Sequence, residues 1–321
     1  MVERQPLVEV RLPTYRRPEL LRRALSSLQA QTWSNWVCHV NDDSPDDESQ
    51  NLCAGLGDSR IQYHRNNPRR YAAENIDAGF ERATGDASYA FVLEDDNIVL
   101  PLFIEDNIRL IGETGAQIIL RNQFLEYETG RTEWGIFDAR FTGGLYAPNE
   151  LLVSAFFSPV ISNGGLFWSR EATTCLRVGH GGCGPVIQEY LRGLAIAENI
   201  YVAMEPLAVW MDNGASTTRS ASPASRKDRK TELRSIQLIR QAVYDALADQ
   251  DRLSLLLSDR IGSPLARREK GVREALCAWP YPSQMGIADR AKAFLRGIAT
   301  VPATVSPDLN HFVDNFRLRH T

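Results

Sequence analysis

Three acidic residues stand together at the end of an apolar segment. Residues 89–93 are mostly apolar, and Glu94, Asp95 and Asp96 follow them directly. An apolar run of this length is typical of a strand that is buried on both faces. Crowded carboxylates repel one another, and their burial without a partner is costly. Mg²⁺ and Mn²⁺ prefer oxygen ligands and accept phosphate oxygens in the same shell. The residues therefore predict a divalent-metal site, with a solvated acidic turn as the alternative.

Strands and helices alternate around this segment. Amphipathic spacing predicts a helix that begins at Pro18 and helices over residues 71–83 and 101–111. Apolar runs predict strands at residues 7–12, 36–41, 61–64 and 116–127. This alternation is typical of an α/β domain with a mixed, mostly parallel sheet. Ligands bind such sheets at the carboxyl ends of the strands. We therefore expect Thr14, Asp42 and Asp96, which follow three strands, to meet in one crevice.

The sequence beyond residue 128 is less regular. Residues 129–149 are rich in Gly and aromatic side chains without a clear period, which indicates a long loop on the substrate side. Asn163, Gly164 and Gly165 indicate a tight backbone beside an apolar strand that contains Trp168. We also expect a short helix over residues 170–176. A helix that carries Glu189 should follow the glycine-rich residues 178–185, with one or two short strands over residues 201–210.

Composition limits the class of protein. The chain has 321 residues, 43% of them hydrophobic and 24% charged, which is ordinary for a globular protein. A net charge of −4 gives no sign of nucleic-acid binding. The five cysteines are scattered without zinc-ligand spacing, which favours a reducing cytoplasm. No apolar run of about 18 residues predicts a transmembrane segment. A peripheral membrane contact through the basic tail stays open.

The composition also changes near residue 213. A Gly/Ser/Thr/Ala-rich stretch and a basic run follow, and amphipathic segments come after them. We therefore predict one α/β domain over residues 1–213, a mobile linker over residues 214–230 and a helical extension over residues 231–321. The helices of that extension are where we expect contact in a homodimer.

Four segments of the chain resemble the inverting family-2 glycosyltransferases, which have the GT-A (Rossmann-like) fold. The segments are residues 8–18 with Leu-Pro-Thr-Tyr-Arg-Arg-Pro, residues 40–46 with Asn-Asp-Asp-Ser-Pro-Asp, residues 69–75 with Arg-Arg-Tyr-Ala-Ala-Glu-Asn, and residues 94–97 with Glu-Asp-Asp-Asn. The last stands where that family has its Asp-X-Asp motif. The match looks closest to the branch of spore-coat polysaccharide enzymes. The resemblance covers roughly residues 6–213.

The resemblance implies a role for each matching residue. Asp96 and Glu94 would hold Mn²⁺ or Mg²⁺ at the diphosphate, and Glu189 would be the general base for the acceptor hydroxyl. Asn163, Gly164, Gly165 and Trp168 would lie on the acceptor and sugar side, where a Trp ring can stack on a pyranose. The residues implied to bind the donor nucleotide are Pro13, Thr14, Tyr15, Arg17, Asp42, Arg70 and Asp95. The donor would be a UDP- or dTDP-sugar, with Asp42 accepting the N3–H of the base.

Two other functions stay open on the sequence. A sugar-phosphate nucleotidyltransferase shares the α/β layout, but it would need a glycine-rich phosphate loop after the first strand, and residues 14–18 contain no glycine. A nucleotide-sugar-binding protein without catalysis would keep the donor residues and lack a working base.

Overall fold

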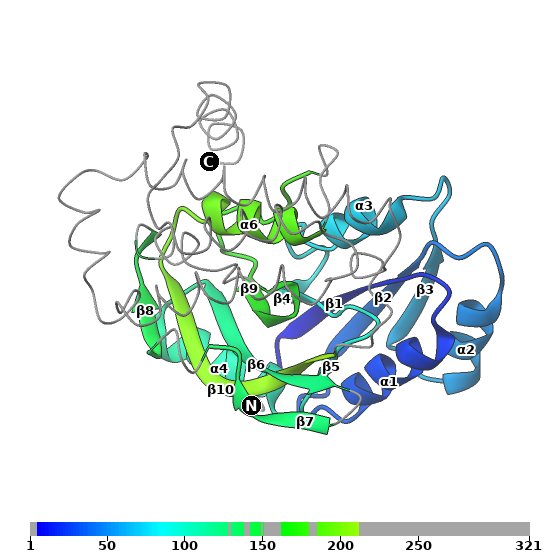
Figure 1. The fold of residues 1–321 in the computed structure, drawn as a ribbon, viewed down its shortest axis with the longest axis horizontal. Helices are drawn as coiled ribbons and strands as arrows, with labels where there is room; N and C mark the ends of the chain where they lie inside the picture. The colour runs from blue at the N-terminus through cyan, green and yellow to red at the C-terminus, as the bar shows by residue number, and fades with distance from the viewer. Residues whose placement is uncertain are drawn as a thin grey trace, which may run out of the picture.

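The computed structural model describes residues 5–127, 130–137, 142–148, 150, 162–179 and 185–211. Within them, helices lie on both sides of a central sheet (Figure 1). The predicted linker at 214–230 and helical extension at 231–321 lie outside the described residues, so the predicted domain boundaries stay predictions.

The first half of the chain alternates strand and helix as the sequence predicts. Its elements are β1 (Leu7–Thr14), α1 (Pro18–Gln29), β2 (Trp36–Asp42), α2 (Glu48–Leu56), β3 (Ile61–Arg65), α3 (Tyr71–Ala78) and β4 (Ala87–Val92). β4 is the buried strand that was expected before the acidic residues, and it ends one residue before Leu93. The predicted mixed, mostly parallel α/β architecture is confirmed.

The second half departs from the prediction in three places. Its elements are β5 (Ile98–Val99), α4 (Phe103–Thr114), β6 (Ile118–Tyr127), β7 (Gly130–Gly135), β8 (Gly144–Tyr146), η1 (Asn163–Gly165), β9 (Leu166–Ser169), α6 (Pro185–Ala195) and β10 (Ile200–Met211). The region predicted as a loop contains β7 and β8, which gain regular structure by pairing with β6 and β10. Residues 170–176 form no helix, and residues 201–210 lie in one long strand.

The sheet has the strand order β3-β2-β1-β4-β9-β6-β10-β5. β1 pairs in parallel with β2 and β4, and β2 with β3, so the first four strands end at one edge. β9 lies antiparallel between β4 and β6 and is the strand that connects the two halves of the sheet. β6 and β10 are again parallel. The carboxyl ends of β1, β2 and β4 therefore form one edge, as the site prediction requires.

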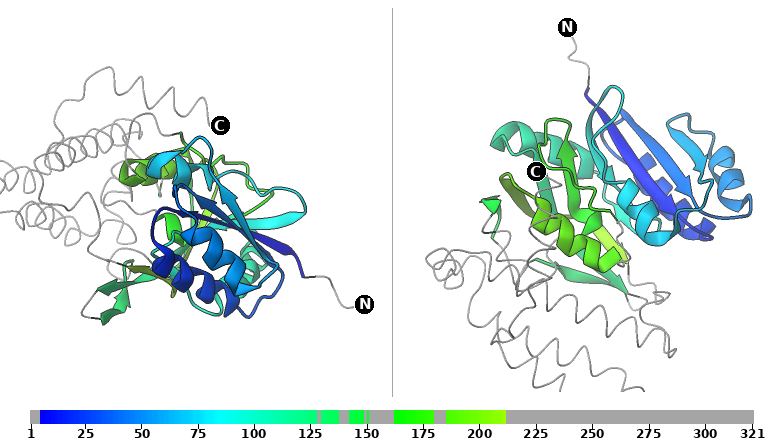
Figure 2. Two further views of the ribbon diagram at one scale, coloured as in Figure 1. Left: turned by 90° about the vertical axis from the view of Figure 1, so that its right-hand side faces the viewer. Right: turned by 90° about the horizontal axis from the view of Figure 1, so that it is seen from above.

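Two helical layers enclose the sheet. α3 and α6 lie on one side of its first strands and α1 and α2 on the other (Figures 1 and 2). The buried side chains of α1 recur at helical spacing, and they are Leu21, Ala24, Leu25 and Leu28. Between the layers, the rings of Phe91, Phe103 and Phe167 pack with centroids 5.0–6.2 Å apart. Burial of these aromatic rings joins β4, α4 and β9 into one core.

A buried arginine explains why α3 ends at Ala78, five residues before the predicted end. Arg11 of β1 forms an ion pair with Glu9 at 2.9 Å and donates to the carbonyl oxygens of Gly79, Glu81 and Arg82. Those carbonyls turn toward the guanidinium and no longer continue the helix. Arg11 of β1 therefore sets the end of α3 through tertiary hydrogen bonds, because a buried cation needs partners.

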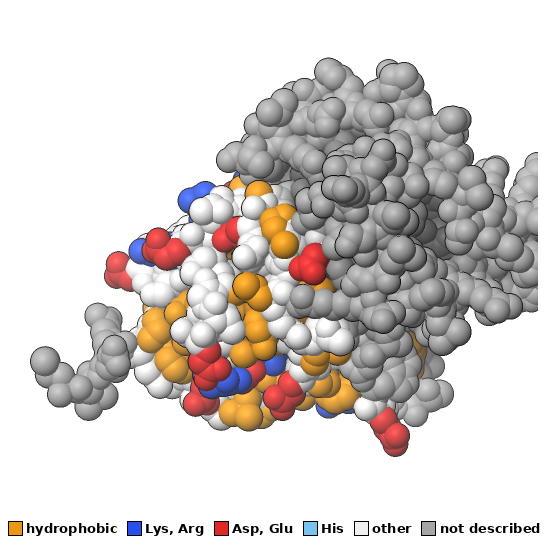
Figure 3. Space-filling view, turned by 90° about the vertical axis from the view of Figure 1, so that its left-hand side faces the viewer, with side chains coloured by type: hydrophobic (Ala, Val, Ile, Leu, Met, Phe, Trp, Pro, Cys, Tyr) orange, Lys and Arg blue, Asp and Glu red, His pale blue; other side chains and the backbone are white. Residues whose placement is uncertain are grey.

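The surface of the described residues carries charged side chains of both signs as well as hydrophobic ones. On the face that Figure 3 shows, acidic and basic side chains are interspersed and hydrophobic side chains lie between them. Among the described residues, no helix combines the length and the apolar character needed to cross a membrane.

Candidate donor and transfer site

The loops after β1 and β4 meet at the carboxyl edge of the sheet. The hydroxyl of Thr14 donates to Asp95 Oδ2 at 2.8 Å, across a sequence separation of 81 residues. Arg17, just before α1, lies 3.3 Å from Asp95 Oδ1 and 3.0 Å from Asp96 Oδ2. A hydroxyl, a cation and two carboxylates from distant loops therefore lie in one place. Pro13 and Tyr15 flank Thr14 in the same loop.

Asp42 occupies the neighbouring position on β2, in register with Thr14. Its Oδ1 accepts the backbone N–H of Ser44 at 2.8 Å, and its Oδ2 accepts the Tyr63 hydroxyl at 2.9 Å. Asp42 has 0% of its surface exposed. A nucleobase can therefore reach this carboxylate only after neighbouring side chains move, and the predicted contact with N3–H stays a prediction.

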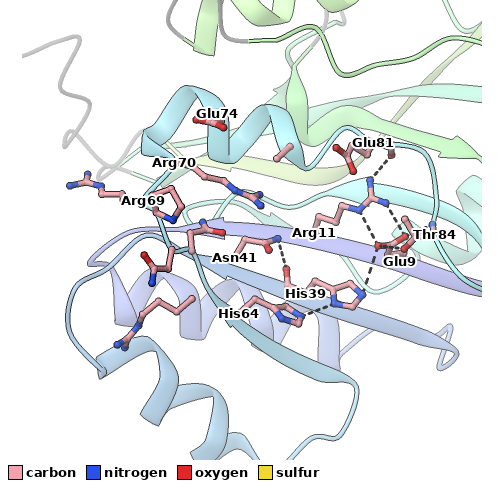
Figure 4. Close-up of a pocket in the computed structure, with 15 residues that line it drawn as sticks. Glu9, Arg11, His39, Asn41, His64, Arg69, Arg70, Glu74, Glu81 and Thr84 are labelled. Atoms are coloured by element: carbon pink, nitrogen blue, oxygen red, sulfur yellow. Dashed lines mark hydrogen bonds and ion pairs between the residues drawn. The ribbon is translucent and has the colours of Figure 1, made fainter.

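Arg70 lies on the other side of the sheet from Asp42. Its backbone N–H donates to Asp43 Oδ1 at 3.1 Å, while its side chain lines a cavity of about 640 Å³. Figure 4 shows this side chain running beneath α3 toward Asn41. Because successive side chains of a strand point to opposite faces, Asn41 and Asp42 face apart. Arg70 and Asp42 are therefore not brought together in this structure.

Glu94 is held by two amides. Its Oε1 accepts from Asn163 Nδ2 at 3.1 Å and its Oε2 from Asn97 Nδ2 at 3.0 Å. Burial, and then the charge of Asp96, raises the pKa of Glu94 to about 7. The same two causes raise the pKa of Asp95 to about 6. The three adjacent carboxylates thus form an anionic cluster that favours an added cation.

The fit to a divalent ion rests on Asp96. Among the described residues, no group of three or more His, Cys, Asp or Glu side chains could by itself hold a metal. Both oxygens of Glu94, which the sequence predicted as a second ligand, already accept from the amides of Asn97 and Asn163. An ion at this loop would therefore take Asp96 as its protein ligand and complete its shell with diphosphate oxygens and water, as Mg²⁺ commonly does.

Glu189 lies on α6, next to the turn that precedes β9. Its Oε1 accepts the backbone N–H of Asn163 at 3.3 Å, and its side chain is half-buried. The carboxylate of Glu189 and that of Glu94 thus both bond to Asn163. The predicted base and the acidic loop meet at one residue.

Comparison with known proteins identifies the domain that carries the loops after β1, β2 and β4. Residues 10–158 match the family model described as glycosyl transferase family 2. These residues form a family-2 glycosyltransferase domain. Over 168 residues the chain is 31% identical to a GalNAc(5)-diNAcBac-PP-undecaprenol beta-1,3-glucosyltransferase of Campylobacter jejuni, covering 51% of each protein. Over 110 residues it is 31% identical to an uncharacterized glycosyltransferase of Rickettsia felis, covering 34% of this chain and 18% of that one. The chain spans about half or less of these relatives.

Solved structures agree with the fold of the glycosyltransferase domain. The structure of S. aureus TarS 1-349 in complex with UDP superposes with a TM-score of 0.55 at 12% identity, covering 97% of this chain and 88% of that one. The mannosyltransferase PcManGT of Pyrobaculum calidifontis, in complex with GDP-Man and Mn²⁺, gives a TM-score of 0.50 at 15% identity, covering 96% and 78%. The predicted GT-A fold is confirmed.

The residues predicted on the acceptor side are buried in the structure. Trp168 is 2% exposed, and its ring stacks on Phe80 with centroids 5.6 Å apart. The structure gives Trp168 a core-packing role in place of the predicted sugar contact, because no face of the ring is open. Gly164 and Gly165 are also buried, in the turn of η1.

Gly165 is required for close packing, and its replacement should destabilise the domain. A Cβ at this position would lie 2.6 Å from the Arg121 carbonyl oxygen and 2.7 Å from Gln123 Nε2. We expect Gly165→Ala to lower the free energy of unfolding by about 1–3 kcal/mol, because overpacking shifts backbone. Gly112→Ala in α4 is the control, since its Cβ meets nothing within 4 Å. Equal thermal unfolding of the two variants would contradict this packing.

Metal-free protein should lose stability as pH rises through 6 to 7. The raised pKa values of Asp95 and Glu94 mean that the folded state holds protons which the unfolded state has released. The stability they contribute is complete below about pH 4, the range of unfolded carboxyls, and is lost as pH rises through the folded values. Thermal unfolding between pH 5 and 8 with a chelator measures this loss. Glu94→Gln should flatten the profile; an unchanged slope would contradict the assignment.

Sequence reasoning missed the residues that hold Glu94 and Glu189 in place. Asn97 was visible beside the acids without a role, and Arg192 was not singled out. The available signal was spacing, since Arg192 lies three residues after Glu189 and four after Gln188 on one helix. Residues at this spacing share one helix face, so the sequence places Arg192 beside Glu189.

Proposed function

We propose that the protein is a metal-dependent, inverting glycosyltransferase that moves a sugar from a nucleoside-diphosphate donor to an acceptor hydroxyl. The observation that carries the proposal is the meeting of Thr14, Arg17, Asp95 and Asp96 at one edge of the sheet. This group offers a guanidinium to phosphate oxygens and a carboxylate to a divalent ion, and the Thr14 hydroxyl holds Asp95 in place. The family-2 match supports the reaction class.

The donor side stabilises the leaving diphosphate. Arg17 can turn from the two carboxylates to phosphate oxygens, since a guanidinium binds both anions in the same fork geometry. Mn²⁺ or Mg²⁺ held by Asp96, when bound, would neutralise the charge that develops on the diphosphate. Asp95 keeps Thr14 in place through its hydrogen bond. Burial and the charge of Asp96 raise the pKa of Asp95, and two cations, Arg17 and the ion, would stabilise its ionised form.

The transfer side supplies the base. The Glu189 carboxylate takes the proton of the acceptor hydroxyl while that oxygen bonds to the anomeric carbon. The bond from the anomeric carbon to the diphosphate oxygen breaks, and its electron pair leaves with the diphosphate. One displacement at one carbon inverts its configuration. The backbone N–H of Asn163 orients the carboxylate.

The donor proposed is a UDP- or dTDP-sugar, in line with the carboxylate of Asp42 at the end of β2. The comparison structures carry UDP in one case and GDP-Man with Mn²⁺ in the other. The acceptor is a hydroxyl of a glycan, a glycoconjugate or a small natural product. The cytoplasmic location and the homodimer stay predictions.

The test is a panel of donors. Calorimetry and thermal shift would use UDP, dTDP and GDP and their sugars, each with and without Mn²⁺, followed by transfer assays on glycan acceptors. We expect Mn²⁺-dependent binding of a pyrimidine diphosphate and release of that diphosphate with acceptor. Formation of a nucleotide sugar from nucleoside triphosphate and sugar phosphate would favour a nucleotidyltransferase. Binding without turnover would favour a non-catalytic binding protein.

A further inference from the structure

A buried arginine on α6 is connected to the acidic loop through a single asparagine. Arg192 has 0% of its surface exposed, and its Nη1 donates to Asn163 Oδ1 at 2.8 Å. Its Nη2 lies 2.9 Å from Asp77 Oδ1, and its guanidinium carbon lies 3.8 Å from the centroid of the Phe80 ring. A buried charge with partners on several sides has one orientation. The side chain of Arg192 is therefore held in one position between α3 and α6.

The asparagine that Arg192 holds is buried, and its side-chain oxygen, side-chain nitrogen and backbone N–H each have a protein partner. Asn163 is 1% exposed. Its Oδ1 accepts from Arg192, its Nδ2 donates to Glu94 Oε1 at 3.1 Å, and its backbone N–H donates to Glu189 Oε1 at 3.3 Å. The orientation of the amide is set by these partners, because only its oxygen can accept from Arg192 and only its nitrogen can donate to Glu94.

We propose that Asn163, oriented by Arg192, is a positioning residue that fixes the donor-side carboxylate Glu94 and the transfer-side carboxylate Glu189 relative to each other. This role replaces the acceptor contact that the sequence predicted for Asn163, and it rests on the proposed function. Asp77 completes the arrangement, since it accepts the backbone N–H groups of Val178 and Gly179 at 3.0 and 2.7 Å as well as Arg192. Residues 178–179, which precede α6, are thereby bonded to the same aspartate that pairs with Arg192.

The first experiment compares two buried asparagines. Asn163→Ala removes both side-chain bonds and keeps the backbone N–H to Glu189. Asn107→Ala is the matched control. Asn107 lies in α4, is also fully buried, and accepts from Nε of the buried Arg121 at 2.9 Å. We expect Asn163→Ala to lower kcat by about ten- to a hundredfold, since displacement of reacting groups by ~1 Å is costly. The Kd for Mn²⁺–UDP should stay within about threefold of the parent value, a factor worth less than 0.7 kcal/mol at ~1.4 kcal/mol per tenfold.

The second experiment reverses the hydrogen bond. Asn163→Asp sets two carboxylates against each other, and Glu94→Gln in the same chain supplies an amide that can donate to the new acid. Thermal unfolding should show Asn163→Asp less stable than the parent, with the double variant restored toward it. Thermal unfolding does not depend on enzymatic activity. A double variant no more stable than Asn163→Asp alone would overturn the proposed contact between Asn163 and Glu94.

The outcomes separate this inference from the proposed function. If the parent transfers sugar and Asn163→Ala has the kcat of Asn107→Ala, the positioning role is overturned and the glycosyltransferase proposal stands. If Asn163→Ala weakens donor affinity as much as it lowers kcat, Asn163 contacts the donor and the inference is again overturned. If the parent transfers nothing to any acceptor, the proposed function fails, and the positioning role fails with it.

Discussion

Glu189→Gln should lower the rate of sugar transfer by at least about 10²-fold, the usual contribution of a general base. The substitution keeps the size of the side chain and an oxygen that can accept the Asn163 N–H, and it removes the proton acceptor. Because a base acts only on the acceptor proton in the transition state, donor affinity should stay within a few-fold of the parent. Transfer kinetics and calorimetry with Mn²⁺–UDP measure the two quantities separately.

Glu198→Gln is a matched control for this variant. Glu198 follows the same helix and is half-buried, and its Oε1 also accepts a backbone N–H, that of Thr174 at 2.8 Å. The control should transfer sugar at the parental rate. Near-parental transfer by Glu189→Gln would mean that another group takes the proton, and Asp138 and Asp212, which lie outside the described residues, would be tested next.

Asp96→Ala should remove the part of donor affinity that depends on Mn²⁺. We expect UDP to bind the variant equally with and without the ion, whereas the parent should gain at least about tenfold, or ~1.4 kcal/mol, from it. The fold should be kept, because loss of one of three crowded carboxylates relieves repulsion. The melting temperature of the metal-free variant should match or exceed that of the parent.

Asp47→Ala controls for the loss of an aspartate that pairs with an arginine, since Asp47 lies 2.6 Å from Arg65 at the surface. Its titrations with UDP should resemble those of the parent. An Mn²⁺-dependent gain that persists in Asp96→Ala would remove Asp96 from the metal site, and the ion would then require ligands elsewhere.

The donor edge could be predicted because parallel strands bring their carboxyl ends together whatever their separation in sequence. Thr14 and Asp95 are an example, since strand order alone places them side by side. The end of α3 could not be predicted, because local propensity favours the helix through Ala83. The helix ends earlier because Arg11, which is distant in sequence, donates to the Gly79 carbonyl.

The transfer side was harder to read for a different reason. Its geometry depends on Arg192, Asn163 and Asp77, which come from three separate segments and meet only after α3 and α6 pack together. Trp168 illustrates the same difficulty, since an aromatic residue near a glycine-rich turn fits a sugar platform as well as a core. The stacking on Phe80 that decides between these roles joins residues 88 positions apart, by number.

The position of β9 in the sheet has a consequence for synthesis of the chain. β9 has four residues, and it lies between β4 and β6 although both precede it in sequence. Until residues 166–169 are made, β4 and β6 each present an unpaired edge, and exposed edges pair readily with other chains. We expect a fragment that ends before residue 166 to aggregate, and folding during translation to be completed late, when this short strand enters between its neighbours.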